Sequence, residues 1–153
     1  MNRRVRHILA FLLAAALIGC DQHPAGSLPV TRMQIGTETF DLEIATSSHD
    51  QEVGLMHRDH LDSDHGMLFI FPDEAERDFW NSDVHFPLDL IFLDAGGKIV
   101  SLKHLDAYSV KNVPSEARAK YTIELNAGTV ARLNLKLGDR LTLPKDAINP
   151  PGQ

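Results

Sequence analysis

The chain has only one cysteine, Cys20, so no disulfide can form within it. It also lacks a Gly-x-Ser-x-Gly nucleophile motif, a Walker-type glycine loop and a Gly-x-Gly-x-x-Gly dinucleotide motif. These absences argue against a thiol enzyme, a conventional serine hydrolase and a nucleotide-binding protein. We therefore expect no catalytic residue of these classes and no cofactor.

The apolar run near the amino end is too short to cross a membrane. It extends over eleven residues from Ile8 to Ile18, which cover about 16 Å as a helix, roughly half of a bilayer core. Three arginines precede this run, as is typical of a signal peptide. The following Leu-Ile-Gly-Cys at residues 17–20 resembles the lipobox of bacterial lipoproteins. We predict that residues 1–19 are cleaved and that Cys20 carries the lipid; the alternative is an ordinary secretory signal followed by a chance cysteine.

Positive charge is scarce, and the predicted cleavage makes it scarcer. The whole chain has a formal charge of −6, and removal of residues 1–19 lowers Lys+Arg from 15 to 12 against 21 acidic residues, which gives −9. Such a domain is repelled by phosphate backbones and anionic lipid heads, so nucleic acid is not expected as a partner. We expect the lipid anchor on Cys20 to provide the membrane contact. Asp21 is typical of Gram-negative lipoproteins retained at the inner membrane, on its periplasmic face.

The remaining sequence predicts one domain between two short irregular segments. Residues 20–29 comprise the lipidated cysteine and a polar tether with proline and glycine. Residues 30–145 suffice for a single core. We expect residues 146–153, which end in Asn-Pro-Pro-Gly-Gln, to form a disordered tail.

Alternating apolar and polar residues predict a mainly β domain with a minor α component. We expect about seven short strands and two short helices in a small barrel-like fold. The expected strands cover residues 33–36, 40–44, 67–71, 88–93, 98–105, 121–125 and 140–143. The expected helices run from Ser48 to Met56, opened by a capping box of Ser48 and Gln51, and from Gly128 to Leu133, capped by Asn126.

Six segments of the chain resemble a known family. They are GLMHRDHL at 54–61, GMLFIF at 66–71, FW at 79–80, PLDLIFLDAGGKIV at 87–100, YTIELNAG at 121–128 and LKLGDRL at 135–141. In this combination and order they resemble the family called "domain of unknown function 192". The resemblance implies a small β-rich domain and no established reaction or ligand.

The chain departs from that family pattern at two places. Where the family usually reads Met-Lys-Asn-Thr after the Phe-Trp pair, this chain has Asn81-Ser82-Asp83-Val84. If the family's lysine and asparagine hold a ligand, this chain has lost both. The cysteine that the family often carries after the strand ending here near Leu105 is also absent.

Two carboxylates on apolar strands are candidate site residues. Asp89 shares a strand face with Ile91 and Leu93, and Glu124 shares the other strand's polar face with Asn126. If the two carboxylates meet in a pocket, they can act as a general acid and base or hold a cation. The structural alternative is that Asp89 accepts backbone N–H groups and that Glu124 is solvated or ion-paired.

Phe79 and Trp80 are candidates for an aromatic surface at the mouth of the barrel. Aromatic platforms suit sugars, peptides and apolar ligands. Core packing is the alternative use of both rings.

The segment from His57 to His65 has the composition of a metal site, with three histidines and three aspartates among nine residues. It lacks the His-Glu-x-x-His or paired-cysteine spacing that imposes ligand geometry. The family resemblance matches Arg58 and Leu61 in this segment, and none of its histidines. A solvated acidic loop is therefore the default interpretation, with zinc or copper binding as the alternative.

Together these observations predict a membrane-tethered, extracytoplasmic binding or accessory domain. Its ligand is a small molecule or an envelope protein, held near Phe79, Trp80, Asp89, Glu124 and Asn126. One alternative is an envelope enzyme that uses Asp89 and Glu124 as a carboxylate pair. A second alternative is a metal-binding protein that uses the loop from His57 to His65.

Overall fold

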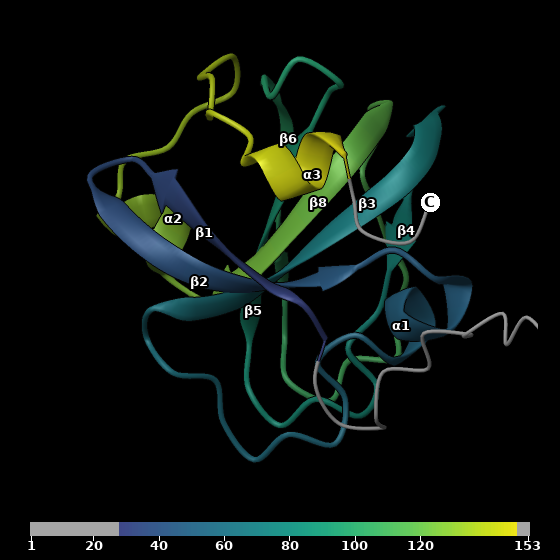
Figure 1. The fold of residues 1–153 in the computed structure, drawn as a ribbon. Helices are drawn as coiled ribbons and strands as arrows, with labels where there is room; N and C mark the ends of the chain where they lie inside the picture. Colours follow the sequence, from purple (N-terminus) through teal and green to yellow (C-terminus); the bar gives the residue numbers. More distant parts are fainter. Residues whose placement is uncertain (1–27, 150–153) are drawn as a thin grey trace, which may run out of the picture.

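A computed structural model describes residues 28–149 (Figure 1), so the predicted signal peptide, Cys20 and Asp21 lie outside the described residues. The mainly β prediction is confirmed, with eight strands and three short helices in the described part. No helix between residues 28 and 149 is long and apolar enough to cross a membrane.

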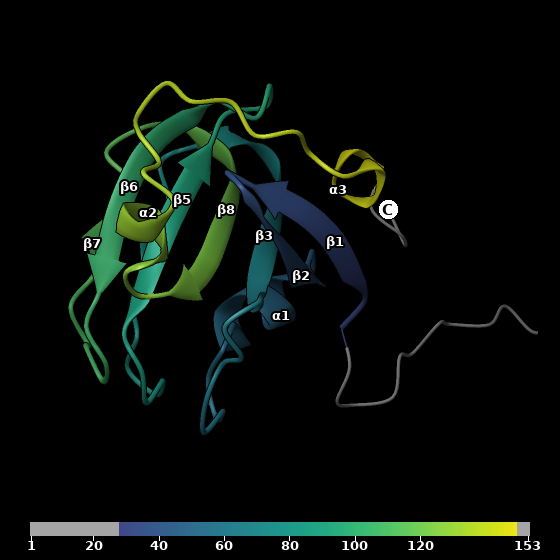
Figure 2. The same ribbon diagram turned by 90° about the vertical axis from the view of Figure 1, so that its left-hand side faces the viewer.

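Six strands form one curved sheet, in the order β1-β2-β3-β8-β5-β6 (Figure 2). The strands are β1 (Val30–Ile35), β2 (Glu38–Ala45), β3 (His65–Ala75), β8 (Ala119–Asn126), β5 (Leu88–Leu93) and β6 (Ile99–Leu105). β2 and β3 pair in parallel, and the other neighbours are antiparallel. A second, two-stranded sheet pairs β4 (Asp78–Phe79) with β7 (Val113–Pro114).

The parallel step from β2 to β3 is made through helix α1 (Ser48–Val53), which begins as the sequence predicts but with a different cap. The Ser47 side chain accepts a hydrogen bond from the backbone N–H of Asp50. The cap is therefore Ser47 in place of Ser48, because it has the extended backbone that an N-cap requires. The helix ends at Val53, before Gly54, whose φ of 49° lies in the left-handed region.

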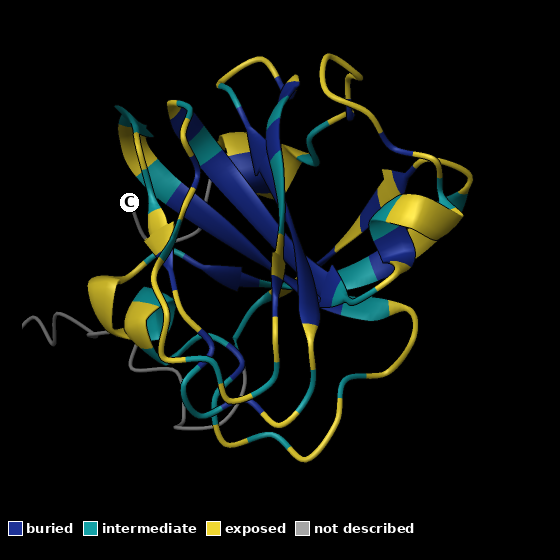
Figure 3. Ribbon diagram, turned by 180° about the vertical axis from the view of Figure 1, so that it is seen from behind, coloured by how far each residue is buried: buried dark blue, intermediate teal, exposed yellow. Residues whose placement is uncertain are grey.

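The sheet is buried on both faces, as the dark blue central strands of Figure 3 show. On one face Ile91, Leu93 and Ile123 belong to a cluster that β1 and β2 extend. On the other face Leu88, Leu90 and Phe92 pack with Met67 and Phe69. Every residue of β5 is consequently buried, because alternate side chains enter two different cores.

The sheet approaches a barrel but does not close. β1 and β6 are its edges, and the C-terminal segment passes between them (Figure 2). The strand expected at 140–143 is reduced to one bridge between Lys98 and Arg140, beside which Leu141 is buried. The segment makes backbone hydrogen bonds to Gly97 and Ile99, and its Leu135 and Leu141 join the core cluster that contains Ile91.

The structure describes residues 146–149 of the expected tail, and most of them form one helical turn. Helix α3 (Lys145–Ile148) packs against the open sheet edge, with Ala147 buried and Asp146 accepting a hydrogen bond from the Thr31 hydroxyl. Composition predicted a tail because polar residues and prolines predominate there.

Candidate functional site

The described residues enclose a pocket of about 350 Å³ beside helix α1, on the sheet face that carries Phe69 and Phe79. Its walls come from α1 and the residues after it, from β3 and from the segment 77–84. Most of the lining is apolar: Val53, Leu55, Met56, Phe69, Phe71, Phe79, Trp80 and Val84. A mostly apolar concavity with a few polar groups is the usual form of a small-molecule site.

Glu124 is the buried acid of this pocket. On β8 it lies between Met67 of β3 and Leu90 of β5, and only 4% of its surface is exposed. Its Oε2 atom has no hydrogen-bond partner. Burial raises the pKa of Glu124 to about 8, against the opposing charge of Arg58. The carboxyl is therefore largely protonated at neutral pH, and neither the solvated nor the ion-paired alternative describes it.

Arg58 is near Glu124 but is paired with a different acid. Its two Nη atoms donate to the Oε atoms of Glu43 at 2.5 and 2.8 Å. This bidentate pair attaches the loop after α1 to strand β2. Because Arg58 is paired with Glu43, its charge lowers the pKa of Glu124 by less than burial raises it.

The two aromatic candidates have different roles. Phe79 is 8% exposed and makes edge-on contacts with Phe69 and Phe92, at ring-centroid distances of 5.1 and 5.5 Å. Trp80 also lines the pocket but is 40% exposed. Phe79 thus belongs to the core and forms a wall of the pocket, whereas Trp80 is free to contact an incoming molecule.

Asn81 is a pocket residue that we did not select from the sequence. It is buried, and its amide nitrogen donates to the backbone carbonyls of Phe86 and Asp106 at 3.1 and 2.9 Å. Its Oδ1 atom has no partner. The sequence contains one indication of its role. Asn81 follows Trp80 directly and begins the segment that departs from the family pattern.

Asp89 lies on the opposite face of the sheet from the pocket. It pairs with Leu125 in register, while Glu124 pairs with Leu90, so the two carboxylates project from opposite faces. Asp89 accepts the backbone N–H of Val130 at 2.9 Å, in helix α2 (Thr129–Arg132), and its Oδ1 lies 3.3 Å from the His104 ring. The carboxylate pair expected for an envelope enzyme is therefore not assembled, and Asp89 has the backbone-accepting role of the structural alternative.

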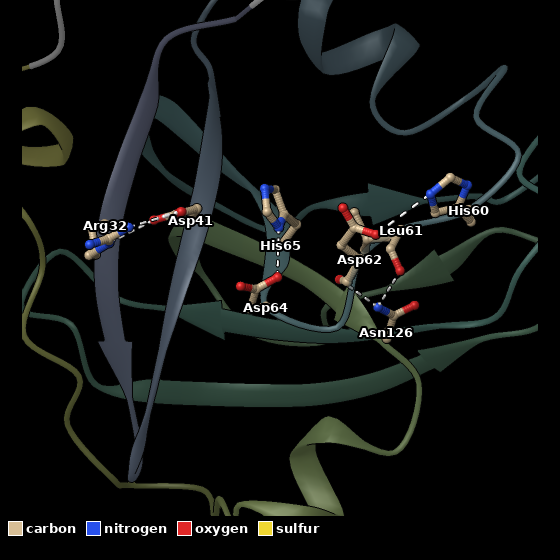
Figure 4. A network of polar contacts seen from close by, with 8 residues as sticks. All are labelled: Arg32, Asp41, His60, Leu61, Asp62, Asp64, His65 and Asn126. Carbon is tan, nitrogen blue, oxygen red and sulfur yellow. Dashed lines mark hydrogen bonds and ion pairs between the residues drawn. The ribbon is translucent and has the colours of Figure 1, made fainter.

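Asn126 orders a loop and is not part of the pocket lining. Its amide nitrogen donates to the carbonyls of Leu61 and Asp62 at 2.9 and 3.0 Å (Figure 4). Its backbone carbonyl accepts from the Thr129 hydroxyl at 2.7 Å. The predicted cap at Asn126 was wrong, because Gly128 is the N-cap residue of α2 and no side chain makes the cap bond. The residue holds together two loops at one end of the sheet.

The histidines between residues 57 and 65 do not converge. His57 lies 2.8 Å from Asp83, His60 lies 3.6 Å from Asp62, and His65 lies 2.9 Å from Asp64. Figure 4 shows His60 and His65 facing different acids. Across residues 28–149 no three potential ligands come together as a metal site.

The matches to known proteins agree with this fold. The sequence profile of the family "domain of unknown function 192", described as an uncharacterized ACR, matches residues 30–143. A crystal structure of a candidate transcription regulator from Sinorhizobium meliloti 1021 shares 34% identity and a TM-score of 0.69, covering 78% of this chain and 97% of that one. A protein of unknown function from Novosphingobium aromaticivorans DSM 12444 shares 29% identity and the same TM-score, covering 79% and 90%. Among proteins with curated descriptions none matches the chain.

Proposed function

The chain belongs to the family "domain of unknown function 192", and we propose that its domain binds a small, largely apolar ligand in the pocket above Glu124. The observation that supports this most strongly is the buried carboxyl of Glu124, which lines an apolar cavity and has an oxygen without a partner. Burial of such a group costs stability unless something compensates it. A bound molecule that satisfies the carboxyl would supply that compensation.

Trp80 supports the same proposal from the outer side of the pocket. Large apolar side chains are usually buried, yet this ring leaves 40% of its surface exposed beside the cavity. Aromatic rings with free faces contact apolar and ring-shaped ligands at low entropic cost. We assign ligand contact to Trp80 and Glu124, with Phe79 as a wall.

A thermal-shift screen of the purified protein tests this function. A ligand present at about a hundred times its dissociation constant adds about 2.7 kcal/mol, enough to raise the melting temperature by several degrees. We expect a shift that disappears in Trp80→Ala and Glu124→Gln. It persists in Tyr108→Ala, which removes a different exposed aromatic ring, and in Asp89→Asn, which changes an acid on the opposite face. A screen of metals, sugars, peptides, amines and organic acids without any such hit would refute the proposal.

The predicted lipid anchor gives this binding domain a location. We propose that Cys20 is acylated and that the domain is tethered to the periplasmic face of the inner membrane, with nucleic acid excluded as a partner by its acidic charge. The support is the lipobox-like sequence at residues 17–20 and the polar tether that follows it. Fractionation of cells compares the native chain with Cys20→Ala. We expect membrane association to be lost in the variant, and recovery of the variant in the membrane fraction would refute the anchor.

A further inference from the structure

Two buried polar atoms of the pocket residues lack a partner, and both are oxygens. They are Oε2 of Glu124 and Oδ1 of Asn81. The orientation of the Asn81 amide is determined by its two donated hydrogen bonds, which place nitrogen toward the Phe86 and Asp106 carbonyls. Its oxygen must therefore accept. The pocket residues thus offer acceptors, and a molecule that completes them must bring hydrogen-bond donors.

The charges around the pocket favour a cation. Its lining contains two exposed acids, Glu52 and Asp78, one base, Arg77, and the buried Glu124, which is largely neutral at pH 7. The Arg77 side chain is already engaged, since it donates to Asp73 Oδ1 at 2.9 Å and to the Ala119 carbonyl at 3.3 Å. An anionic ligand would therefore meet an excess of negative charge, whereas a cation would reduce it.

The walls define the rest of the ligand. Trp80, Phe69 and Phe79 present aromatic rings, and ring faces attract organic cations as well as apolar groups. A volume of about 350 Å³ is at the small end of the range for ligand sites. It suits a compact apolar or aromatic body with one polar head.

We propose that the pocket binds a small organic amine, with its ammonium group at Glu124 and Asn81 and its apolar body against Trp80 and Phe79. This inference rests on the proposed function and adds the chemical class of the ligand. The ammonium group has several N–H donors, which can bond to Oε2 of Glu124 and Oδ1 of Asn81, the two oxygens without a hydrogen-bond partner. No covalent bond is made or broken between protein and ligand.

Binding of an amine is coupled to the loss of one proton from Glu124. Because burial raises the pKa of Glu124 to about 8, the empty pocket holds a neutral acid below that pH. The amine arrives as an ammonium ion, and pairing favours the carboxylate, so the carboxyl proton leaves to water. Only the deprotonated fraction binds, so affinity rises at most about tenfold per pH unit below the pKa and then levels off.

The other charged groups around Glu124 are either in ion pairs or exposed at the pocket wall. Arg58, in the loop after α1, is paired with Glu43 of β2, and Arg77 is paired with Asp73. Glu52 of α1 and Asp78 of β4 are exposed residues of the pocket wall. The direct strand neighbours of Glu124 are the uncharged Met67 and Leu90, and beyond Leu90 the Lys103 ammonium is paired with Glu116. Glu124 is therefore the group whose ionisation an incoming ammonium changes most.

Three probes with one phenyl body and different heads test the inference: phenethylamine, phenethyl alcohol and hydrocinnamate. Titration calorimetry of the purified protein is performed between about pH 6 and about pH 9, in two buffers that differ in protonation enthalpy. We expect phenethylamine to bind tightest, to gain affinity as the pH rises towards 8, and to release a proton in the acidic part of the range. Glu124→Gln weakens phenethylamine by about tenfold or more at the alkaline end and removes the pH dependence, whereas Asp89→Asn changes neither.

The outcomes separate this inference from the proposed function. Tighter binding of the alcohol or the carboxylate probe, with its loss in Trp80→Ala, overturns amine recognition and leaves the pocket as a ligand site. Binding of phenethylamine that is independent of pH, or unchanged in Glu124→Gln, also overturns it. If none of the three probes binds, the amine inference is overturned, and the broader thermal-shift screen decides whether the pocket binds another class of molecule.

Discussion

Glu43 and Glu124 lie on the two sides of Met67 in one row across strands β2, β3 and β8, and of the two only Glu43 is paired with an arginine. The two acids share a face because residues in register point the same way. Arg58 neutralises Glu43 and leaves Glu124 buried without a counter-ion of its own. The same row thus contains one structural ion pair and one acid available to a ligand.

Glu124 makes the native protein less stable as the pH rises. In the unfolded chain its carboxyl loses its proton near 4.5, whereas in the folded chain the pKa is about 8, so the folded state holds the extra proton between these values. Stability is unaffected below that window, falls through it and is lowest above it. We expect Glu124→Gln to gain stability relative to the native protein from about pH 5 to about pH 8, by on the order of 1 kcal/mol per pH unit at most. Urea denaturation across the window measures this.

The control for this measurement is Asp41→Asn. Arg32 holds the pKa of Asp41 below its usual value, so this carboxyl is ionised in both states throughout the window. The difference in the free energy of unfolding between Asp41→Asn and the native protein should therefore stay constant between about pH 5 and about pH 8. A constant difference for Glu124→Gln as well would show that Glu124 is ionised in the folded protein.

Arg58→Met is expected to destabilise the domain by about 1 to 2 kcal/mol, because it leaves the half-buried Glu43 without its bidentate partner. Arg32→Met provides the comparison, since Arg32 also pairs with a strand carboxylate but leaves 74% of its side chain exposed. We expect a clearly smaller effect there, as exposed ion pairs contribute little. Denaturation of both variants at neutral pH provides the measurement. Equal losses in the two variants would contradict the burial argument.

Asn126→Ala should release the loop after α1 from the end of strand β8. Two hydrogen bonds to the Leu61 and Asp62 carbonyls are lost, with a cost of about 1 to 3 kcal/mol. Amide hydrogen exchange should become faster in residues 61–65 while the central strands stay protected. Gln34→Ala removes one exposed side-chain bond to the Gly36 carbonyl and serves as the control. Unchanged exchange in that loop would show that other contacts hold it.

Trp80 gives an optical signal for the pocket, because it is the only tryptophan in the chain. With 40% of its surface exposed, its emission should be accessible to acrylamide in the free protein. We expect a bound ligand to reduce acrylamide quenching and to shift the emission to shorter wavelength. Titration of the native protein and of Glu124→Gln with phenethylamine, followed by tryptophan fluorescence, measures this effect. Ligand binding detected by calorimetry without any change in quenching would remove Trp80 from the site.

Several local features were predictable from the sequence. The strands expected at residues 40–44, 88–93 and 98–105 match β2, β5 and β6, because they depend on alternation within one strand. Trp80 and Glu124 were selected because an aromatic pair and an acid on an apolar strand are unusual. The weaker predictions concern the carboxyl end, where Arg140 and Ala147 take part in contacts between distant segments.

The burial of Glu124 shows why the rest required the tertiary structure. Alternation along β8 predicted that Glu124 faces away from Ile123, which is correct, but it also suggested a solvated face. β8 is a central strand between β3 and β5, and the segments around α1 and β4 cover that second face. Whether a strand is central depends on pairings with residues far away in the chain, so periodicity within the strand carries no information about it.

The sequence by itself determined the family, the mainly β composition and which side chains share a face within each strand, because these depend on motifs and on a period of two residues. Only the tertiary structure decided which strands are neighbours and in what register. That register separates Asp89 from Glu124 by placing them on opposite faces, and it brings Glu124 into one pocket with Trp80 and Asn81. The physical reason is that strand pairing and the covering of a sheet face depend on contacts between residues far apart in the chain, which pack into two cores.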